Sequence, residues 1–272
     1  MGWLELLLLS VLQGLTEFLP VSSSGHLVVA NAVLERLGLS QTKDLIEVSI
    51  ALHLGTLASV LAYYRTEIAR LLGEDRRVIG LLVIGTLPAA VVGVGIKKGL
   101  DDASADALLD SVWLAALMFP VTAAVLVYAS RRREGTDPYQ AMSWRRALGI
   151  GAAQAVAILP GVSRSGSTIA AGLAAGLDRE SASTFAFLLA IPAILGAGAL
   201  EALEALESGT TGTPIERLAV GFVASFIVGW GALSLLIRFV KRGRLAVFAW
   251  YLVPLSVAVI AWLLWDGRAP GG

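Results

Sequence analysis

The ten residues PGVSRSGSTI, at positions 160–169, place one arginine, three serines and a threonine inside an otherwise apolar region. The sequence GIGAAQAVAIL precedes them and IAAGLAAGL continues the chain from Ile169. A charged side chain in such surroundings is costly unless it meets an anionic group. This stretch therefore predicts a polar break in a membrane-embedded helix, at a place where an anion binds.

The composition of the whole chain is that of an integral membrane protein. Of its 272 residues 56% are hydrophobic and 15% are charged, whereas about 25% are charged in an average soluble domain. The absence of cysteine excludes disulfides and thiolate metal sites, and the zero net charge argues against binding of nucleic acid through a general basic field. Six apolar runs reach the roughly 20 residues that a spanning helix needs: 45–64, 78–96, 111–130, 181–200, 218–237 and 245–265.

Two further apolar segments, 3–37 and 147–177, are each interrupted by a proline and a serine-rich turn, at Pro20 and Pro160. A single helix over the first segment would extend about 52 Å, much longer than the roughly 30 Å hydrocarbon core of a bilayer. Each half alone is too short to cross. We therefore expect two re-entrant hairpins, whose turns are tolerated at membrane depth only if they are buried in protein or line a wet cavity.

The two broken segments are copies of one another. A shift of 141 residues aligns VSSSG (21–25) with VSRSG (162–166), so that Ser23 lies opposite Arg164. The identical pairs are Gln13 and Gln154, Val21 and Val162, Ser22 and Ser163, Ser24 and Ser165, and Gly25 and Gly166.

Each copy is followed by three candidate spans, which defines the expected fold class. This is an all-α integral membrane protein with an inverted-topology repeat, in which each half is a re-entrant helix hairpin plus three transmembrane helices, giving six spans and ten helices. The chain is one membrane domain, 1–272, with 1–133 as the first repeat and 141–266 as the second. An odd number of spans in the first copy inserts the second copy upside down.

The distribution of basic residues predicts the orientation. If the tails and the loops 35–44, 97–110 and 201–217 lie outside, 14 Lys and Arg residues lie on the cytoplasmic side and 6 on the other, with Arg164 between them. This asymmetry satisfies the positive-inside rule. The first hairpin then enters from outside and the second from the cytoplasm, so their turns can meet.

Where the turns meet, the sequence predicts an anion site. Gln13 and Glu17 are spaced i, i+4 and share one helix face, and each second half-helix directs its free N–H groups and positive dipole end at the junction. Two such helix ends and an arginine are typical of a phosphate site. The neighbouring polar residues are Ser22, Ser23, Ser24 and His26 at the first turn, and Ser163, Arg164, Ser165, Ser167 and Thr168 at the second.

Structural roles are the alternative for some of these residues. Arg164 could pair with Glu17 as an internal strut, and His26 could serve only in packing or capping. His53, alone in its span, is expected to be structural. Serines that bond their own helix backbone are common in membrane helices, and this is the expectation for Ser10, Ser49, Ser59 and Ser225.

QGLTEFLPVSSSGH (13–26) and PGVSRSGST (160–168) resemble the two signature motifs of the undecaprenyl pyrophosphate phosphatase family, of the bacitracin-resistance type. The resemblance covers essentially the whole chain. It implies hydrolysis of a long-chain polyprenyl diphosphate to the monophosphate at the outer face of the plasma membrane, which recycles the carrier lipid for cell-wall or glycan synthesis. One departure is Gln13, where many members have Glu, because Gln supplies no second negative charge to a metal.

The resemblance and the residue chemistry assign the same roles. Ser23 is the expected nucleophile on the terminal phosphorus, although direct attack by water is an alternative, and His26 is the expected proton carrier. Glu17 either holds a divalent cation, expected to be Mg²⁺, or orients His26. Arg164 presents its planar fork to phosphate oxygens. The remaining expected phosphate donors are Gln13, Ser22, Ser24, Ser163, Ser165 and Thr168.

Two other functions fit parts of the pattern. A lipid-phosphate transporter or flippase would also use inverted repeats, but the grouping of Ser23, His26 and Glu17 favours an enzyme. An intramembrane serine protease is suggested by GVSRS, in which a serine replaces the final glycine of G-x-S-x-G. The expected partners are the polyprenyl diphosphate substrate, of undecaprenyl or dolichyl type, and membrane lipids, with no nucleic acid; a homodimer is left open.

Overall fold

The computed structural model describes residues 2–38, 45–208 and 213–267. Within these ranges the chain is helical and forms no strand. Five of its helices are long and apolar enough to cross a membrane, by length and composition. The chain is therefore a multi-pass membrane protein with an all-α fold.

Both predicted hairpins are present. The first consists of α1 (Trp3–Phe18) and α2 (Ser23–Arg36), and the second of α8 (Trp144–Val156) and α9 (Arg164–Ala174). In each hairpin a serine caps the second helix, because its Oγ accepts a hydrogen bond from a glycine N–H three residues later. Ser22 receives this bond from Gly25 at 3.3 Å, and Ser163 receives it from Gly166 at 3.1 Å.

The six predicted spans are helices, and five of them meet the length of a span. The first, α3 (Leu45–Tyr63), is apolar, but its apolar stretch, Glu47–Tyr63, is shorter than a span. The described residues form twelve α-helices, two more than the ten expected. The two additional helices are short and lie in the connections: α4 (Arg65–Leu71) and α6 (Asp102–Leu109). The long helices are α5 (Arg76–Gly99), α7 (Val112–Arg131), α10 (Arg179–Ser208), α11 (Ile215–Lys241) and α12 (Ala249–Trp265).

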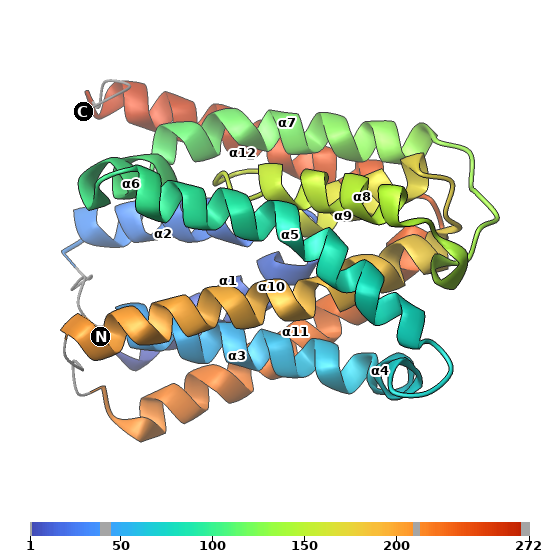
Figure 1. Ribbon diagram of the computed structural model, residues 1–272. Coiled ribbons are helices and arrows are strands. Elements are labelled where there is room, and N and C mark those ends of the chain that lie inside the picture. Colours follow the sequence, from blue (N-terminus) through green and yellow to red (C-terminus); the bar gives the residue numbers. More distant parts are fainter. Residues whose placement is uncertain (1, 39–44, 209–212, 268–272) are drawn as a thin grey trace.

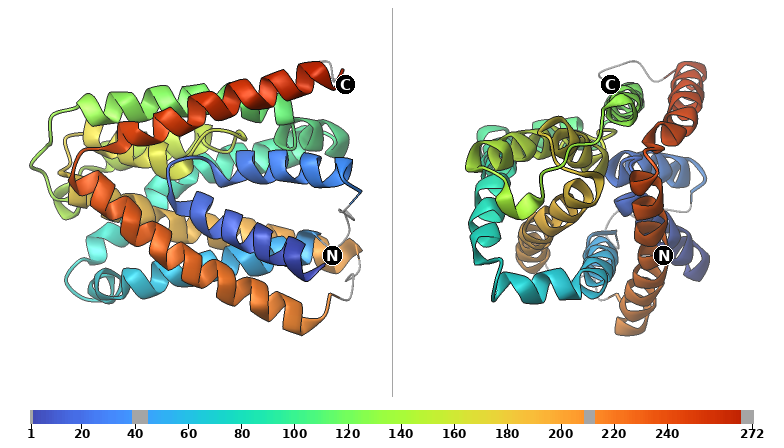
Figure 2. Two further views of the ribbon diagram at one scale, coloured as in Figure 1. Left: turned by 180° about the vertical axis from the view of Figure 1, so that it is seen from behind. Right: turned by 90° about the vertical axis from the view of Figure 1, so that its right-hand side faces the viewer.

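The helices form one elongated bundle. Figure 1 shows the start of α1, the end of α12 and α6 at one end of the bundle, and α4 and the connection after α7 at the other. An ion pair between Arg36 and Asp266 joins the ends of α2 and α12. In the left view of Figure 2 the first hairpin, in blue, lies on the near face of the bundle between α11 and α12; α1 packs on α11, and α8 on α5.

The hydrophobic core surrounds the places where the hairpins turn. The largest fully buried side chains include Phe18 at the end of α1, Phe119 on α7, and Phe185 and Phe187 on α10. The rings of Phe18 and Phe187 meet edge to face with their centroids 5.8 Å apart. Aromatic packing of this kind excludes lipid from the turns, so that their polar backbone groups find partners within the protein.

Candidate active site

The two hairpin turns meet, as the motifs predict. The backbone N–H of Gly161 donates to Ser22 Oγ at 3.1 Å, which joins the second turn to the first. Gly25 lies against the same segment so closely that a Cβ added there would be 2.7 Å from the nitrogen of Gly161. Gly161 itself has φ +91°. Both glycines are therefore required, one by close approach and the other by its backbone conformation.

The turns are held by two hydroxyl side chains. Ser22 accepts from the N–H groups of both Gly25 and Gly161, and it has φ +75°, which makes it the one residue other than glycine with positive φ in the described ranges. Thr122, on α7, donates to the carbonyl of Gly161 at 2.7 Å and accepts from the N–H of Ser163 at 3.0 Å. The strained backbone at Ser22 is therefore held from both turns, an arrangement often found at functional sites.

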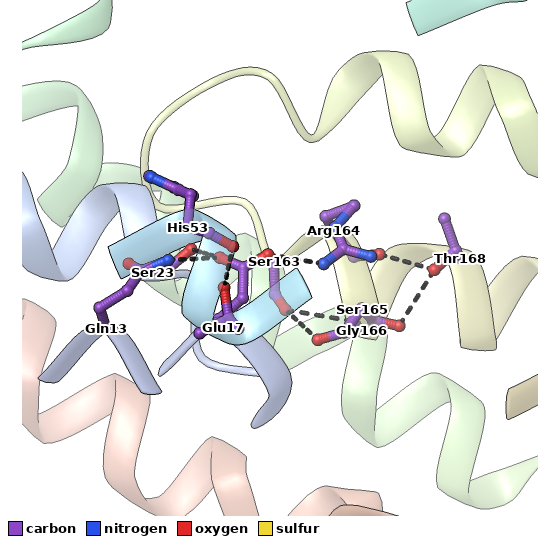
Figure 3. Close-up of polar contacts among 10 residues, drawn as sticks. Gln13, Glu17, Ser23, His53, Ser163, Arg164, Ser165, Gly166 and Thr168 are labelled. Atoms are coloured by element: carbon purple, nitrogen blue, oxygen red, sulfur yellow. Dashed lines mark hydrogen bonds and ion pairs between the residues drawn. The ribbon is translucent and has the colours of Figure 1, made fainter. Parts of the chain in front are cut away.

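Glu17 is the centre of the polar cluster between the turns. Its Oε1 accepts from Nη2 of Arg164 at 2.7 Å, and its Oε2 accepts from Oγ of Ser23 at 2.7 Å. Gln13, one helical turn earlier on α1, donates to the same Oε2 at 3.2 Å. Figure 3 shows these side chains gathered where α1, α3 and the start of α9 come together. The odd pair of the repeat, Ser23 and Arg164, thus shares one carboxylate.

The ion pair at this centre is largely removed from water. The side chains of Arg164 and Glu17 are 16% and 6% exposed. Nη1 of Arg164 is buried and has no hydrogen-bond partner, although buried donors are nearly always paired. The guanidinium therefore has an unused donor available for an anion.

The cluster opens into a cavity of about 540 Å³. Its far walls are apolar and come from α5 and α10, including Val94, Ala197 and Leu200. The only charged side chains that line it, among the described residues, are Glu17 and Arg164. The predicted site residues that line it are Glu17, Ser22, Ser23, Ser24, Ser163 and Arg164.

Four predicted site residues do not line this cavity. Gln13 does not reach the cavity, but it donates a hydrogen bond to Glu17, which lines it. Ser165 bonds the cap serine Ser163, Oγ to Oγ, at 3.2 Å. Thr168 donates to the carbonyl of Arg164 at 2.8 Å, within α9. The fourth residue is His26.

His26 is buried and does not line the cavity. Its Nδ1 lies 2.7 Å from the carbonyl oxygen of Ser22, and its Nε2 lies 2.8 Å from the hydroxyl of Tyr251 on α12. The ring stacks on Tyr251 and packs against Phe119. Both nitrogens are occupied by structural partners, because α2 turns this face toward α7 and α12.

Two residues that line the cavity were not assigned to it from sequence. His53, expected to be structural, faces the cavity from α3. Gln154, on α8, is 3% exposed, and neither polar atom of its side chain has a partner. The sequence held a signal for Gln154, because it is the repeat equivalent of Gln13, but it held none for His53.

The described residues contain no group of three or more His, Cys, Asp or Glu side chains that could hold a metal. Glu17 is the one carboxylate among the described residues that line the cavity, and both its oxygens already accept hydrogen bonds. This donor set does not build a metal site by itself. It fits an ion such as Mg²⁺ only where phosphate oxygens of a ligand supply the other positions.

The fold and the site together define a polytopic membrane protein with a largely apolar cavity, an arginine at its wall and a serine hydroxyl bonded to a carboxylate. Residues 6–258 match the family model described as bacitracin resistance protein BacA. The chain belongs to this family.

Curated relatives extend over nearly the full length of the chain. An undecaprenyl-diphosphatase of Rhodopirellula baltica is 45% identical over 258 residues, which cover 94% of this chain and 96% of the relative. Proteins of the same name from Rubrobacter xylanophilus and Corynebacterium efficiens are 38% and 36% identical. The alignments cover 96% and 98% of this chain, and 98% and 92% of those relatives.

Proposed function

We propose that this chain is an undecaprenyl-diphosphatase, which hydrolyses a long-chain polyprenyl diphosphate to the monophosphate and inorganic phosphate. The observation that carries the proposal is the contact of Ser23 and Arg164 with the two oxygens of Glu17, at 2.7 Å each, beside an apolar-walled cavity. The arrangement offers a nucleophile and a phosphate-binding cation, which a transporter does not need. The names of the aligned relatives support the same activity.

Ser23 is the proposed nucleophile. Its Oγ attacks the terminal phosphorus while the bond from that phosphorus to the bridging oxygen breaks, and the electron pair leaves with the polyprenyl monophosphate. The proton of the hydroxyl passes to Glu17 Oε2, which already accepts it in a hydrogen bond. Water then attacks the phosphoserine, the Oγ–P bond breaks, and Oγ recovers its proton from Glu17. In the alternative route water attacks the terminal phosphorus directly and Ser23 only binds the phosphate.

Charge neutralisation supplies most of the acceleration in phosphoryl transfer. Arg164 has one donor on Glu17 and one free, so it can hold a phosphate oxygen without first leaving the carboxylate. Gln154 can donate to the second phosphate group through its unpartnered Nε2. Ser22, Ser24 and Ser163 add hydroxyls at the same wall of the cavity.

The apolar part of the cavity suits the lipid tail of such a substrate. The walls formed by Ala90, Val94, Ala197 and Leu200 lead away from the polar cluster between α5 and α10. A prenyl chain that lies there removes apolar surface from water, and this would keep the reacting phosphate next to Ser23. We infer that head-group and tail recognition are divided between the two parts of one cavity.

Glu17 is the proposed ligand of a divalent cation, which would be bound together with the diphosphate. When bound, such an ion would neutralise negative charge on the phosphate oxygens. Because Arg164 already neutralises negative charge on Glu17, less of that charge remains to attract the cation. The chain therefore relies on the substrate for most of the coordination.

We propose that residues 1–133 and 141–266 are inverted repeats of a single membrane domain, 1–272, in the plasma membrane. Support comes from the equivalent caps at Ser22 and Ser163 and from the entry of the two hairpins from opposite ends of the bundle (Figure 1). The basic asymmetry predicts that the end with α6 faces outward. Because α5 and α10 run from the polar cluster toward that end, the cavity would open to the extracytoplasmic face.

The activity is tested with purified protein in detergent, given undecaprenyl diphosphate and assayed for released inorganic phosphate and for the monophosphate lipid. We expect both products in equal amounts. Release of phosphate by wild-type protein but not by Arg164→Ala would assign the activity to this cavity. Binding of the lipid with no turnover by wild-type protein would contradict the proposed function.

A further inference from the structure

The two histidines of the chain share one local contact and have different tertiary surroundings. His53 Nδ1 lies 2.9 Å from the carbonyl oxygen of Ser49, four residues earlier, and 3.2 Å from the Oγ of the same serine. His26 Nδ1 lies 2.7 Å from the carbonyl oxygen of Ser22, also four residues earlier. A carbonyl oxygen only accepts hydrogen bonds, so Nδ1 of each histidine carries the proton. In both rings Nε2 is then the nitrogen with a free lone pair.

What Nε2 meets is different in the two cases. In His26 it faces the hydroxyl of Tyr251 at 2.8 Å, which donates to it. In His53 it has no hydrogen-bond partner among the described residues, and the ring lines the cavity that holds Glu17 and Ser23. His53 thus brings to the wall of the reaction space a ring whose Nε2 no side chain of the described residues occupies, and His26 does not.

Glu17 is poorly suited to accept the proton of the hydrolytic water, so a second base is needed. Its Oε1 is ion-paired with Arg164, and its Oε2 already receives Ser23 and Gln13. A carboxylate bound by three donors is a weak acceptor for the proton of a second molecule. Turnover nevertheless requires that a water molecule lose a proton as it attacks phosphorus, whether the phosphorus is on Ser23 or on the substrate.

We propose that His53 Nε2 is the proton acceptor for the hydrolytic water. This assignment rests on the proposed phosphatase activity. The O–H bond of the water breaks as its oxygen bonds to phosphorus, the proton goes to Nε2, and the bond from phosphorus to Ser23 Oγ, or to the bridging oxygen, breaks with its electron pair. The N–H of Nδ1, bonded to the Ser49 carbonyl, fixes the tautomer and the orientation of the ring.

The proton also has a way to leave. On its other side His53 borders a second, smaller cavity of about 70 Å³, lined by the polar side chains of Gln13, Asn31 and Ser49. Oε1 of Gln13 is buried there without a partner. The rest of its lining is apolar, from Leu9, Leu27, Val48 and Leu52, so the polar groups lie together at one part of the wall. Water molecules held there by these groups would take up the proton from the imidazolium and return the ring to its basic form.

The charged groups that face His53 are few. Glu17 on α1 and Arg164 on α9 share its cavity, and Glu47 lies on α3 itself. Two side-chain hydrogen bonds join α11 to α3, from Ser225 to the Leu52 carbonyl and from Ser59 to the Phe226 carbonyl, and neither hydroxyl titrates in the working range. Protonation of a base in this cavity should therefore be visible as an acid limb in the pH profile, because imidazole changes charge between about pH 5 and 8.

The test compares His53→Gln with His26→Gln, in detergent, on undecaprenyl diphosphate between pH 5 and 8. We expect His53→Gln to lower kcat by about 100-fold, within the range of general-base catalysis, and to remove the acid limb. His26→Gln should retain the acid limb, although loss of its bonds to Ser22 and Tyr251 will lower its thermal stability. An acid limb that survives in His53→Gln and disappears in His26→Gln would overturn the assignment.

A second variant separates chemistry from misfolding. His53→Ala leaves space in the cavity, and added imidazole should restore at least tenfold of its lost rate, while His26→Ala should gain nothing. Lack of rescue in a His53→Ala protein that elutes and melts like wild type would overturn the assignment. If wild-type protein releases no phosphate, the proposed function itself fails; if wild type is active and His53→Gln matches its rate and profile, only the role of His53 fails.

Discussion

Arg164 donates from Nη2 to Oε1 of Glu17 at 2.7 Å, and the two residues are 147 positions apart in the sequence. This contact joins the two hairpins through a buried ion pair. Breaking such a pair by removing one partner is strongly destabilising, because the other charge is left buried. In a phosphate-binding cavity the same pair also holds the guanidinium in place before the anion arrives.

Replacement of the arginine by lysine tests the fork geometry. Arg164→Lys keeps the charge but loses the second, parallel donor. We expect kcat/KM on undecaprenyl diphosphate to fall at least tenfold, equivalent to about 1.4 kcal/mol of transition-state stabilisation. Arg146→Lys, at an exposed arginine paired with Asp137 at 2.6 Å, is the control and should stay within twofold. Equal losses in both variants would argue against phosphate binding by Arg164.

Removal of the Ser23 hydroxyl tests the nucleophile. Ser23→Ala should nearly abolish phosphate release while substrate binding is largely retained, because Arg164 and the helix N-termini still hold the diphosphate. Turnover and lipid binding are measured on the same preparation. The control is Ser10→Ala, since Ser10 Oγ only bonds the Leu6 carbonyl within α1. Near-normal release by Ser23→Ala would reassign the nucleophile to water.

Mutation of Gln154 should weaken substrate binding without lowering the stability of the protein. Gln154→Leu removes two buried polar atoms that have no partner, and relief of such a penalty leaves the protein as stable or more stable. We expect an unchanged or higher Tm together with roughly a tenfold rise in KM. Gln140→Leu, on the connection between α7 and α8, is the control and should leave KM unchanged. A lower Tm with unchanged KM would show a structural role.

Chelation tests the cation expected at Glu17. We expect activity to fall in excess EDTA and to return when Mg²⁺ is added, because a cation bridging phosphate oxygens neutralises developing charge. The substrate must be stripped of metal beforehand. Full turnover of metal-free lipid in EDTA would leave Arg164 as the cation that acts on the phosphates.

Single cysteines test the orientation, because the chain has none of its own. Ser104→Cys, on α6, and Arg133→Cys, after α7, lie at opposite ends of the bundle. An impermeant thiol reagent added to right-side-out membranes should label position 104 and spare position 133. The reverse pattern would place the cavity mouth on the cytoplasmic side.

Much of the architecture could be predicted from local patterns. The run lengths located the long helices, and Pro20 and Pro160 with their serine-rich turns located both hairpins, because a helix break needs a missing N–H and a new cap. The short helices α4 and α6 were missed, since seven or eight residues carry too little periodicity to be recognised. The i, i+4 spacing of Gln13 and Glu17 correctly placed them on one face, as their 3.2 Å contact confirms.

The site could be predicted only where the repeat brought its residues together. Equivalence of the two turns predicted that Ser23 and Arg164 would come close, and they share the carboxylate of Glu17. The motif predicted equally that Ser165 and Thr168 would reach the phosphate. In the structure Ser165 bonds the cap serine and Thr168 bonds the backbone of α9, because a hydroxyl near a helix N-terminus has such partners nearby. Their contact with phosphate stays a prediction.

The sequence alone determined that this is a helical membrane protein with two broken helices and an arginine between their turns, since these depend on composition and on short-range patterns. From sequence His26 was expected to carry the proton and His53 to be structural, although in the structure each has Nδ1 next to the carbonyl four residues before it. Only the packing of α2 against α7 and α12 gave His26 the hydroxyl of Tyr251. Only the position of α3 beside the turns placed His53 at the cavity. A hydrogen-bond partner more than 200 residues away, 225 in this case, is decided by tertiary contacts that no local pattern encodes.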